Sequence, residues 1–222
     1  TAHPGRWPTS GWSSDIESYT RRKLRSHVER FYTPDNALIV LVGNMDPATE
    51  IERIRTYFDR IPAAATVREE LPTREPVPLG HTRLVVNMDA APRVDLFFHT
   101  PGYPDSALYA LDVAEGILSG RTGRLYQRLV TSERLCTNVG AGSAWRIGDG
   151  YFHVWAELKE GVTPDTVETI LDEEIGRLAD IPPGDREIQR VVNSIRMNFV
   201  NRISKLEPLS DQLAWFERIG SW

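Results

Sequence analysis

The sequence predicts an α+β fold, in which a mostly antiparallel sheet has helices packed on one face, and three observations lead to this prediction. From residue 82 onward, strand-like stretches come in adjacent pairs, as expected for antiparallel hairpins. Segments with apolar residues at helical spacing follow each pair. Upstream, residues 20–61 show a helix, strand and helix pattern, and residues 62–78, rich in proline and charge, separate the two parts as an extended linker.

The first part carries a helix, a strand and a second helix. Thr20 is a suitable N-cap for a helix over residues 21–32, whose apolar residues fall on one face. Residues 37–42 form a continuous apolar run, typical of a strand buried on both faces. Asp46 and Pro47 then supply the N-cap and the first residue of the next helix.

The second part begins with two predicted strands, over residues 82–88 and 93–100. Asp105 then caps a helix, and another helix is predicted over residues 122–134. The apolar residues expected to be buried on the first of these helices are Leu108, Leu111, Val113, Ala114, Ile117 and Leu118.

Residues 138–147 and 151–159 read as a hairpin around Gly148-Asp149-Gly150, whose Asp-Gly step suits a tight turn. Three helices complete this part, over residues 163–180, 185–205 and 206–219. We expect the four strands to form one sheet, covered by the helices near residues 107–119 and 188–199.

The composition excludes several classes of function. With 222 residues, 41% of them hydrophobic, the chain can bury the core of one large domain or one and a half. A formal charge of −5 argues against a nucleic-acid partner, which requires a clustered basic surface. No apolar run approaches the roughly 18 residues of a membrane span. Cys136, the single cysteine, is predicted to be a small buried hydrophobe, and this usage fits a bacterial cytoplasm or periplasm equally.

No metal site is predicted within this chain. The five histidines are His3, His27, His81, His99 and His153. None has a second histidine and a glutamate at the spacing of a zinc-binding helix, and His27 and Glu29 are too close in sequence to face one ligand. His99 and His153 lie in predicted strands, where two alternatives remain: hydrogen-bonded histidines, or a metal pair formed across strands.

The remaining polar patterns are weaker. The sequence has no Gly-x-Ser-x-Gly elbow of a serine hydrolase. Arg121, Arg124 and Arg128 share a helix face at spacings of three and four residues. They could offer charge to a peptide carboxylate, or they could pair with acidic neighbours such as Glu115 and Glu133.

Two blocks of the sequence resemble one known family. Residues 12–47 read Trp-Ser-Ser-Asp-Ile-Glu-Ser-Tyr-Thr, a basic helix, Phe-Tyr-Thr-Pro-Asp-Asn-Ala and Leu-Ile-Val-Leu-Val-Gly-Asn-Met-Asp-Pro. Residues 100–135 contain a strand-end Pro101, the capping Asp105 and Gly-Arg-Leu-Tyr-Gln-Arg-Leu at 123–129. Both blocks resemble the insulinase/pitrilysin family of inverzincin zinc metallopeptidases, but the inverted zinc motif of that family is absent from this sequence.

The resemblance implies a domain organisation. Residues 1–61 would be the C-terminal end of a preceding peptidase-family domain, residues 62–78 the linker, and residues 79–222 a second, non-catalytic domain truncated at its C-terminus. Family members enclose a chamber between two halves of two α+β domains each, in which zinc activates the water that hydrolyses a peptide. Their zinc ligands lie upstream of the matching segment, so zinc is expected in the full-length parent and not in this chain.

The resemblance also bears on Val130 and Thr137. In each family member, one of the two halves of the protein supplies an arginine and a tyrosine that bind the substrate, from a Leu-Arg-Glu-x-x-x-Leu-x-Tyr segment. In this chain Val130 and Thr137 replace that pair. No catalytic, substrate-binding or metal-binding residue is therefore assigned to this chain. A domain without the pair is expected on the zinc-bearing half or in an inactive member.

Two hypotheses of function follow from the resemblance. In the first, the chain is a non-catalytic part of a zinc metalloendopeptidase, and its partners are the peptide substrate and a missing half, on the same protein or on a homologous subunit. In the alternative, it is a degenerate, inactive member that acts as a structural or peptide-binding subunit, like the core subunits of respiratory complexes.

Overall fold

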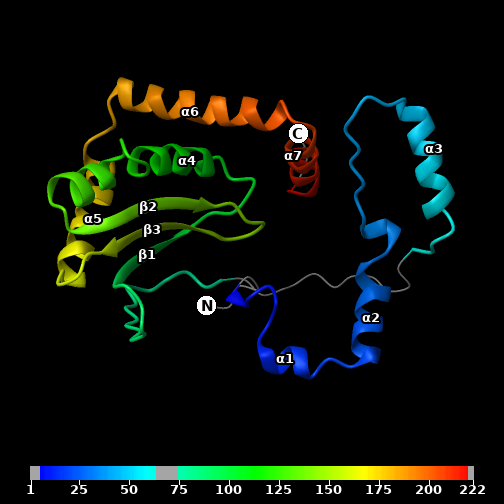
Figure 1. Cartoon of the computed structure of the whole chain (residues 1–222), viewed down its shortest axis with the longest axis horizontal. Coiled ribbons are helices and arrows are strands. Elements are labelled where there is room, and N and C mark those ends of the chain that lie inside the picture. Colours follow the sequence, from blue (N-terminus) through cyan, green and yellow to red (C-terminus); the bar gives the residue numbers. More distant parts are fainter. Residues whose placement is uncertain (1–5, 64–74, 220–222) are drawn as a thin grey trace. The chain divides into compact units, whose positions relative to one another are not determined.

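The computed structural model describes residues 6–63 and 75–219, which divide into two compact units (Figure 1). One unit contains the described residues up to Pro76 together with those from Asn201 onward, and the other contains Val77–Val200. Most of the predicted linker, residues 64–74, lies outside the described residues, and residues 75–79 form neither helix nor strand. No helix in the described ranges is long and apolar enough to cross a membrane.

The first unit is helical, with its predicted helices confirmed. It contains α1 (Ser13–Glu17), α2 (Arg21–Phe31), the short 3-10 helix η2 (Pro34–Asn36), α3 (Pro47–Phe58) and α7 (Leu206–Ile219). The Thr20 hydroxyl accepts a hydrogen bond from Lys23 N at 3.3 Å. The Asp46 carboxylate accepts one from Thr49 N at 3.0 Å. Both caps satisfy amides that a helix leaves free at its N-terminus.

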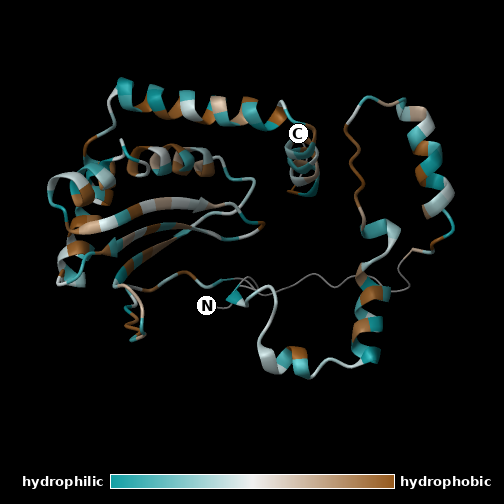
Figure 2. Ribbon diagram, in the orientation of Figure 1, coloured by the Kyte–Doolittle hydropathy of each residue, from teal (hydrophilic) through white to brown (hydrophobic). Residues whose placement is uncertain are grey.

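The strand predicted over residues 37–42 is wrong, because these residues form no β-ladder. Leu38, Ile39 and Leu41 are 51%, 42% and 50% exposed. Figure 2 shows this extended run, which follows η2, as a hydrophobic stretch. A strand buried on both faces needs neighbouring strands for its backbone hydrogen bonds, and none of the described residues provides one beside it.

The second unit contains a three-stranded antiparallel sheet in the order β1-β3-β2. Its strands are β1 (Arg93–Thr100), β2 (Cys136–Ala144) and β3 (Gly150–Leu158), which confirms the predicted strand at 93–100 and the predicted hairpin. β2 ends earlier than expected, because the chain after Ala144 turns away and the Arg146 carbonyl accepts a hydrogen bond from Tyr103 N at 2.8 Å.

The strand predicted over residues 82–88 is also wrong. Leu84 and Val86 are 83% and 66% exposed, and the segment pairs with no strand. Arg83 instead forms ion pairs with Asp165 and Glu168 of α5. Residues of high strand propensity form a strand only if the segment lies along a sheet edge, and these ion pairs hold the segment beside α5.

The helices of this unit are α4 (Ala107–Leu118), the π-helix η3 (Tyr126–Ser132), α5 (Pro164–Asp180) and α6 (Asp185–Ile203), of which the residues after Val200 belong to the first unit. The N-cap of α4 is Ser106, one residue after the predicted Asp105, although the Asp105 carboxylate accepts a hydrogen bond from Ala107 N at 2.8 Å. The helix expected over residues 122–134 begins at Arg124 and is mostly π-helical, a conformation often found at functional sites. Its chain exits through Arg134, which has a φ of 57°.

The core lies between the sheet and the helices α4, η3 and α5. Fully buried members include Leu118, Leu125, Leu129, Val154 and Leu171, all at 0% exposure. The expectation that residues 188–199 cover the sheet is wrong, because α6 packs on the outer side of α4 (Figure 1).

A close contact between α4 and α6 explains why α6 packs on α4. A Cβ added to Gly116 of α4 would lie 2.4 Å from Val191 Cγ1 of α6. The glycine therefore lets the two helices approach, and α5 takes the place on the sheet that was expected for α6.

Candidate functional site

Arg124, one of the three arginines predicted to share a helix face, pairs with α6. Its Nε and Nη2 donate to the two carboxylate oxygens of Glu187 at 2.9 and 2.7 Å. These hydrogen bonds raise the pKa of Arg124 and lower that of Glu187. The predicted pairing with Glu115 is wrong, because the Glu115 carboxylate accepts a hydrogen bond from Ser143 N instead.

Arg128 holds three carboxylates. Its guanidinium donates to Glu174 at 2.8 Å, to Glu133 at 2.9 Å and to Glu173 at 2.5 Å, which confirms the predicted pairing with Glu133. Glu174 is 2% exposed and also accepts from Arg177 at 2.9 Å. The hydrogen bond to Glu174, followed by the other two, raises the pKa of Arg128. A buried carboxylate therefore lies between two guanidinium groups.

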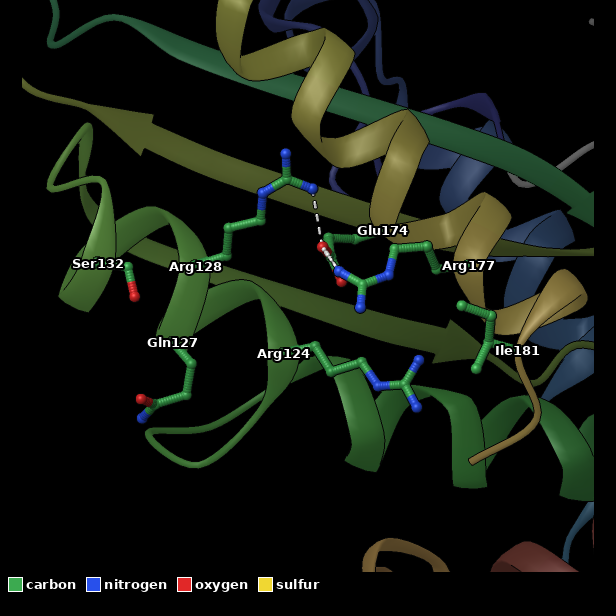
Figure 3. A pocket seen from close by; sticks show the side chains of 7 residues that line it. All are labelled: Arg124, Gln127, Arg128, Ser132, Glu174, Arg177 and Ile181. Atoms are coloured by element: carbon green, nitrogen blue, oxygen red, sulfur yellow. Dashed lines mark hydrogen bonds and ion pairs between the residues drawn. The ribbon is translucent and has the colours of Figure 1, made fainter. Parts of the chain in front are cut away.

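These side chains line a shallow pocket of about 400 Å³, in which Arg128 and Arg177 converge on Glu174 (Figure 3). The lining residues are Arg124, Gln127, Arg128, Ser132, Glu174, Arg177 and Ile181. Each of the three guanidinium groups has at least one carboxylate partner. The pocket therefore offers no uncompensated positive charge to an anion, and its charged side chains brace the helical segment 124–132 against α5 and α6.

The outer edge of β2 is occupied by the side chains of Glu115 in α4 and of Ser119, the C-cap residue of that helix. The Ser119 hydroxyl donates to the Ala141 carbonyl at 3.1 Å and accepts from Ala141 N at 2.7 Å. The Glu115 carboxylate accepts from Ser143 N at 2.8 Å. These backbone groups point away from β3, so the two side chains take the place of a neighbouring strand. A peptide cannot add to this edge without displacing them.

Glu115 should make the stability of the chain depend on pH. Burial raises its pKa above the ordinary value of 4.5, against the opposing hydrogen bond from Ser143 N. The folded state thus keeps this proton to higher pH than the unfolded state, and stability is lost as pH rises from about 4.5 through the folded pKa. Glu115→Gln retains an acceptor oxygen and removes the ionisation.

We expect Glu115→Gln to lose less stability than the wild-type chain over this pH interval in urea denaturation series. Asp112 is the matched second group, because burial also raises its pKa, against a hydrogen bond from Trp145. Adding Asp112→Asn to Glu115→Gln should flatten the profile further. Parallel stability profiles for wild type and Glu115→Gln would contradict the assignment.

The face of the sheet opposite the core, which we call the open face, is formed by alternate residues of the three strands. They are Arg93, Asp95, Phe97 and His99 of β1, Tyr151, His153, Trp155 and Glu157 of β3, and Gly140, Gly142 and Ala144 of β2. The rings of Phe97 and His153 stack with centroids 4.2 Å apart and an interplanar angle of 1°. Asp95 Oδ1 lies 2.7 Å from His153 Nε2. Arg93 lies over the Trp155 ring at 4.7 Å.

The two histidines of the open face are not directly opposite each other. His99 is opposite Tyr151 and His153 is opposite Phe97, so the two histidines are not cross-strand partners. His153 Nε2 is held by Asp95, which favours the hydrogen-bonded alternative for this residue. Within residues 6–63 and 75–219, no three His, Cys, Asp or Glu side chains are placed to hold a metal ion.

One family model, described as the peptidase M16 inactive domain, matches residues 18–195. The chain belongs to the peptidase M16 family. The insulinase-type resemblance is thereby confirmed. Zinc protease PqqE of Helicobacter pylori is 24% identical over 221 residues, which cover 96% of this chain and 48% of that relative. The chain thus spans about half the length of the curated M16 relatives it matches.

Solved structures show the same fold. A crystal structure of a protease from Helicobacter pylori has a TM-score of 0.91 at 19% identity, covering 97% of this chain and 53% of that one. A chain of complex III from Candida albicans has a TM-score of 0.77 at 18% identity, covering 96% of this chain and 53% of that one. At these identities the likeness establishes the α+β fold, as predicted, and not the activity.

Within the M16 fold, Val130 and Thr137 lie in different environments. Val130 belongs to η3, and its partly buried side chain packs against the core. Thr137 is exposed at the irregularity between Cys136 and Asn138 in β2, where its hydroxyl donates to the Glu157 carbonyl at 3.3 Å. Neither side chain offers a long, charged donor of the kind that binds a peptide carbonyl.

Proposed function

We propose that this chain is a non-catalytic part of a zinc-dependent M16 endopeptidase, which hydrolyses peptides in an enclosed chamber. The observation that carries the proposal is the match of residues 18–195 to the M16 inactive domain, together with relatives that are named zinc proteases. Val130 and Thr137, which stand in place of the arginine and tyrosine, support a position on the half that bears the zinc.

The described residues do not fit a catalytic zinc. Such a site needs three protein ligands around an open position, and His153, the histidine with a carboxylate neighbour, stacks on Phe97 and is held by Asp95. We therefore assign the metal to residues outside this chain. Its own contribution is then a scaffold and a wall of the chamber, with the second half supplying the arginine and tyrosine.

Substitution of Thr137 tests this assignment in the full-length parent protein. We expect Thr137→Ala to leave peptide turnover within a few fold of wild type, because the short hydroxyl donates to the sheet backbone. Replacing the arginine or tyrosine of the other half should nearly abolish turnover. The opposite result would be a loss of turnover of more than about a hundredfold from Thr137→Ala with the fold intact, equivalent to roughly 2.7 kcal/mol of transition-state stabilisation. It would show that the proposal assigns this domain to the wrong half.

A second candidate is an inactive structural subunit. The fold shared with a chain of complex III favours it, as does the absence of the arginine and tyrosine pair. Purified parent protein distinguishes the two candidates. Turnover of unfolded peptides that stops on chelation and returns with zinc supports the peptidase. Stable incorporation into a larger assembly, with no turnover by the parent or the assembly, supports the structural role.

We further propose that residues 1–61 complete a preceding M16 domain in the longer protein. The apolar faces of α2 and α3 are uncovered: Leu24 and Val28 are 51% exposed, Ile51 is 49% exposed and Tyr57 is 60% exposed. Amphipathic helices gain most of their stability by packing such a face on a core. A sheet supplied by additional sequence would provide that core and would pair with residues 37–42.

Hydrogen exchange can detect this packing. We expect the amides of α2 and α3 to exchange with little protection in the 222-residue chain and to become strongly protected in the longer protein. Amides of β3, which is paired on both sides, should be protected in both proteins and serve as the control. Equal protection of α2 in the two proteins would contradict the proposal.

A further inference from the structure

The open face is a preorganised aromatic surface. Its rings are already stacked, with Tyr151 edge-on to Phe97 at 5.6 Å and His153 parallel to Phe97 at 4.2 Å. Asp95 fixes the His153 ring, while Phe97 remains 61% exposed. A rigid aromatic surface loses little conformational entropy on binding, and its exposed ring can accept an apolar side chain.

The charges on this surface are paired among themselves. Arg93 Nε lies 3.0 Å from both carboxylate oxygens of Asp95, and Arg93 Nη1 lies 3.7 Å from Glu157. Asp95 also contacts His153. Single-stranded nucleic acid, the other common partner of stacked aromatic rings, requires a positive groove for its phosphates. The paired charges of the open face instead suit an uncharged apolar group.

Two glycines of β2 on the open face differ in their surroundings. A Cβ on Gly140 would lie 2.8 Å from the Trp155 ring, so packing inside the chain explains that glycine. A Cβ on Gly142, beside His153, would meet no atom within 4 Å. Glycine in the interior of a strand weakens the strand. A strand glycine that no packing contact inside the chain explains often marks a place where another backbone approaches closely.

The size of the open face limits its partner. The seven residues of β1 from Arg93 to His99 give the face a length of roughly 20 Å. Its three strands give a width of roughly 14 Å, so its area is about 300 Å². A stable interface between folded proteins needs about 800 Å² from each side. A second copy of the chain would therefore not be held by this face alone, whereas an extended peptide of about six residues matches its length.

We propose that the open face binds an extended peptide segment, with its backbone over Gly142 and an aromatic or large aliphatic side chain against the rings of Phe97 and His153. This rests on the proposed peptidase function, for which it names a class of substrate: unfolded segments that carry a large apolar residue. The edge of β2 is closed by Ser119 and Glu115, so the peptide lies on the face and not along that edge.

The binding test uses the 222-residue chain and the peptide acetyl-Gly-Gly-(4-fluorophenylalanine)-Gly-Gly-Gly-amide, followed by broadening of its fluorine resonance. We expect saturable binding that a leucine peptide competes with and that glycine or glutamate peptides do not. Gly142→Val should weaken binding at least tenfold without lowering the thermal midpoint, because the site is open. Phe97→Ala, at an exposed position, should weaken it as well.

Gly176→Ala is the matched control, since Gly176 lies in α5 and a Cβ there meets nothing within 4 Å. It should bind the peptide like wild type. The proposal is overturned if no binding is detected at millimolar peptide, or if wild type and Gly142→Val bind the peptide with equal affinity. It is also overturned if the chain dimerises through this face and Gly142→Val abolishes the dimer. These outcomes are independent of turnover by the parent protein, whose absence would instead refute the peptidase function.

Discussion

Replacing Arg128 with methionine should lower the free energy of unfolding by about 3–5 kcal/mol, because a buried carboxylate would lose a principal partner. Glu174 is 2% exposed, and its remaining partner, Arg177, has a side chain that is 55% exposed. Urea denaturation followed by circular dichroism measures the change. The effect should exceed that of Arg25→Met, which removes an exposed pair with Glu29 worth at most about 1 kcal/mol.

A double substitution separates the cost of the unpaired charge from the value of the pair. Arg128→Met combined with Glu174→Leu removes both buried partners and should recover much of the lost stability, since well-packed apolar residues often replace a buried ion pair without loss. A double variant that is no more stable than Arg128→Met would show that Glu174 is not the source of the destabilisation.

Leu118→Asp should destabilise the second unit by about 4 kcal/mol or more, because it places an unpaired charge in the core. Leu118 is 0% exposed and packs among the buried residues of the sheet, η3 and α5. We expect the near-ultraviolet circular dichroism of the folded unit to be lost at temperatures where the wild-type chain is folded.

Leu111 and Tyr109 provide a graded comparison on the same helix. Leu111 was expected to be buried, but it is only partly buried against the core, so Leu111→Asp should cost less, about 3 kcal/mol. Tyr109 is 59% exposed, but its ring lies edge-on to Trp145 at 5.2 Å, so Tyr109→Asp should cost about 1 kcal/mol, still less than Leu111→Asp. Equal effects at Leu118 and Leu111 would contradict the observed orientation of α4.

Features that depend on residues close together in the sequence were predicted correctly, and features that depend on residues far apart were not. The caps at Thr20 and Asp46 were predictable because each side chain bonds an amide three residues away. The strands at 37–42 and 82–88 were not, because a strand also needs a partner from elsewhere in the chain. Residue pattern carries no information about whether that partner is present.

The candidate sites show the same division. The pairing of Arg128 with Glu133, five residues away, was predictable, whereas the carboxylate of Glu174, 46 residues away, was not. The hairpin that contains β3 was predictable, and in the structure buried and partly exposed residues alternate along this strand. The sequence did not show that Asp95 would meet His153, 58 residues away, because that contact depends on the register between β1 and β3.

The sequence by itself determined the family, the α+β class, most of the helices and the absence of an inverted zinc motif from this chain, because these depend on residues close together in the chain. Only the tertiary structure decided that α4 separates α6 from the sheet, that Ser119 and Glu115 close the edge of β2, and that Gly142 lies open beside His153. These features follow from strand register and helix packing, which join residues far apart in the sequence.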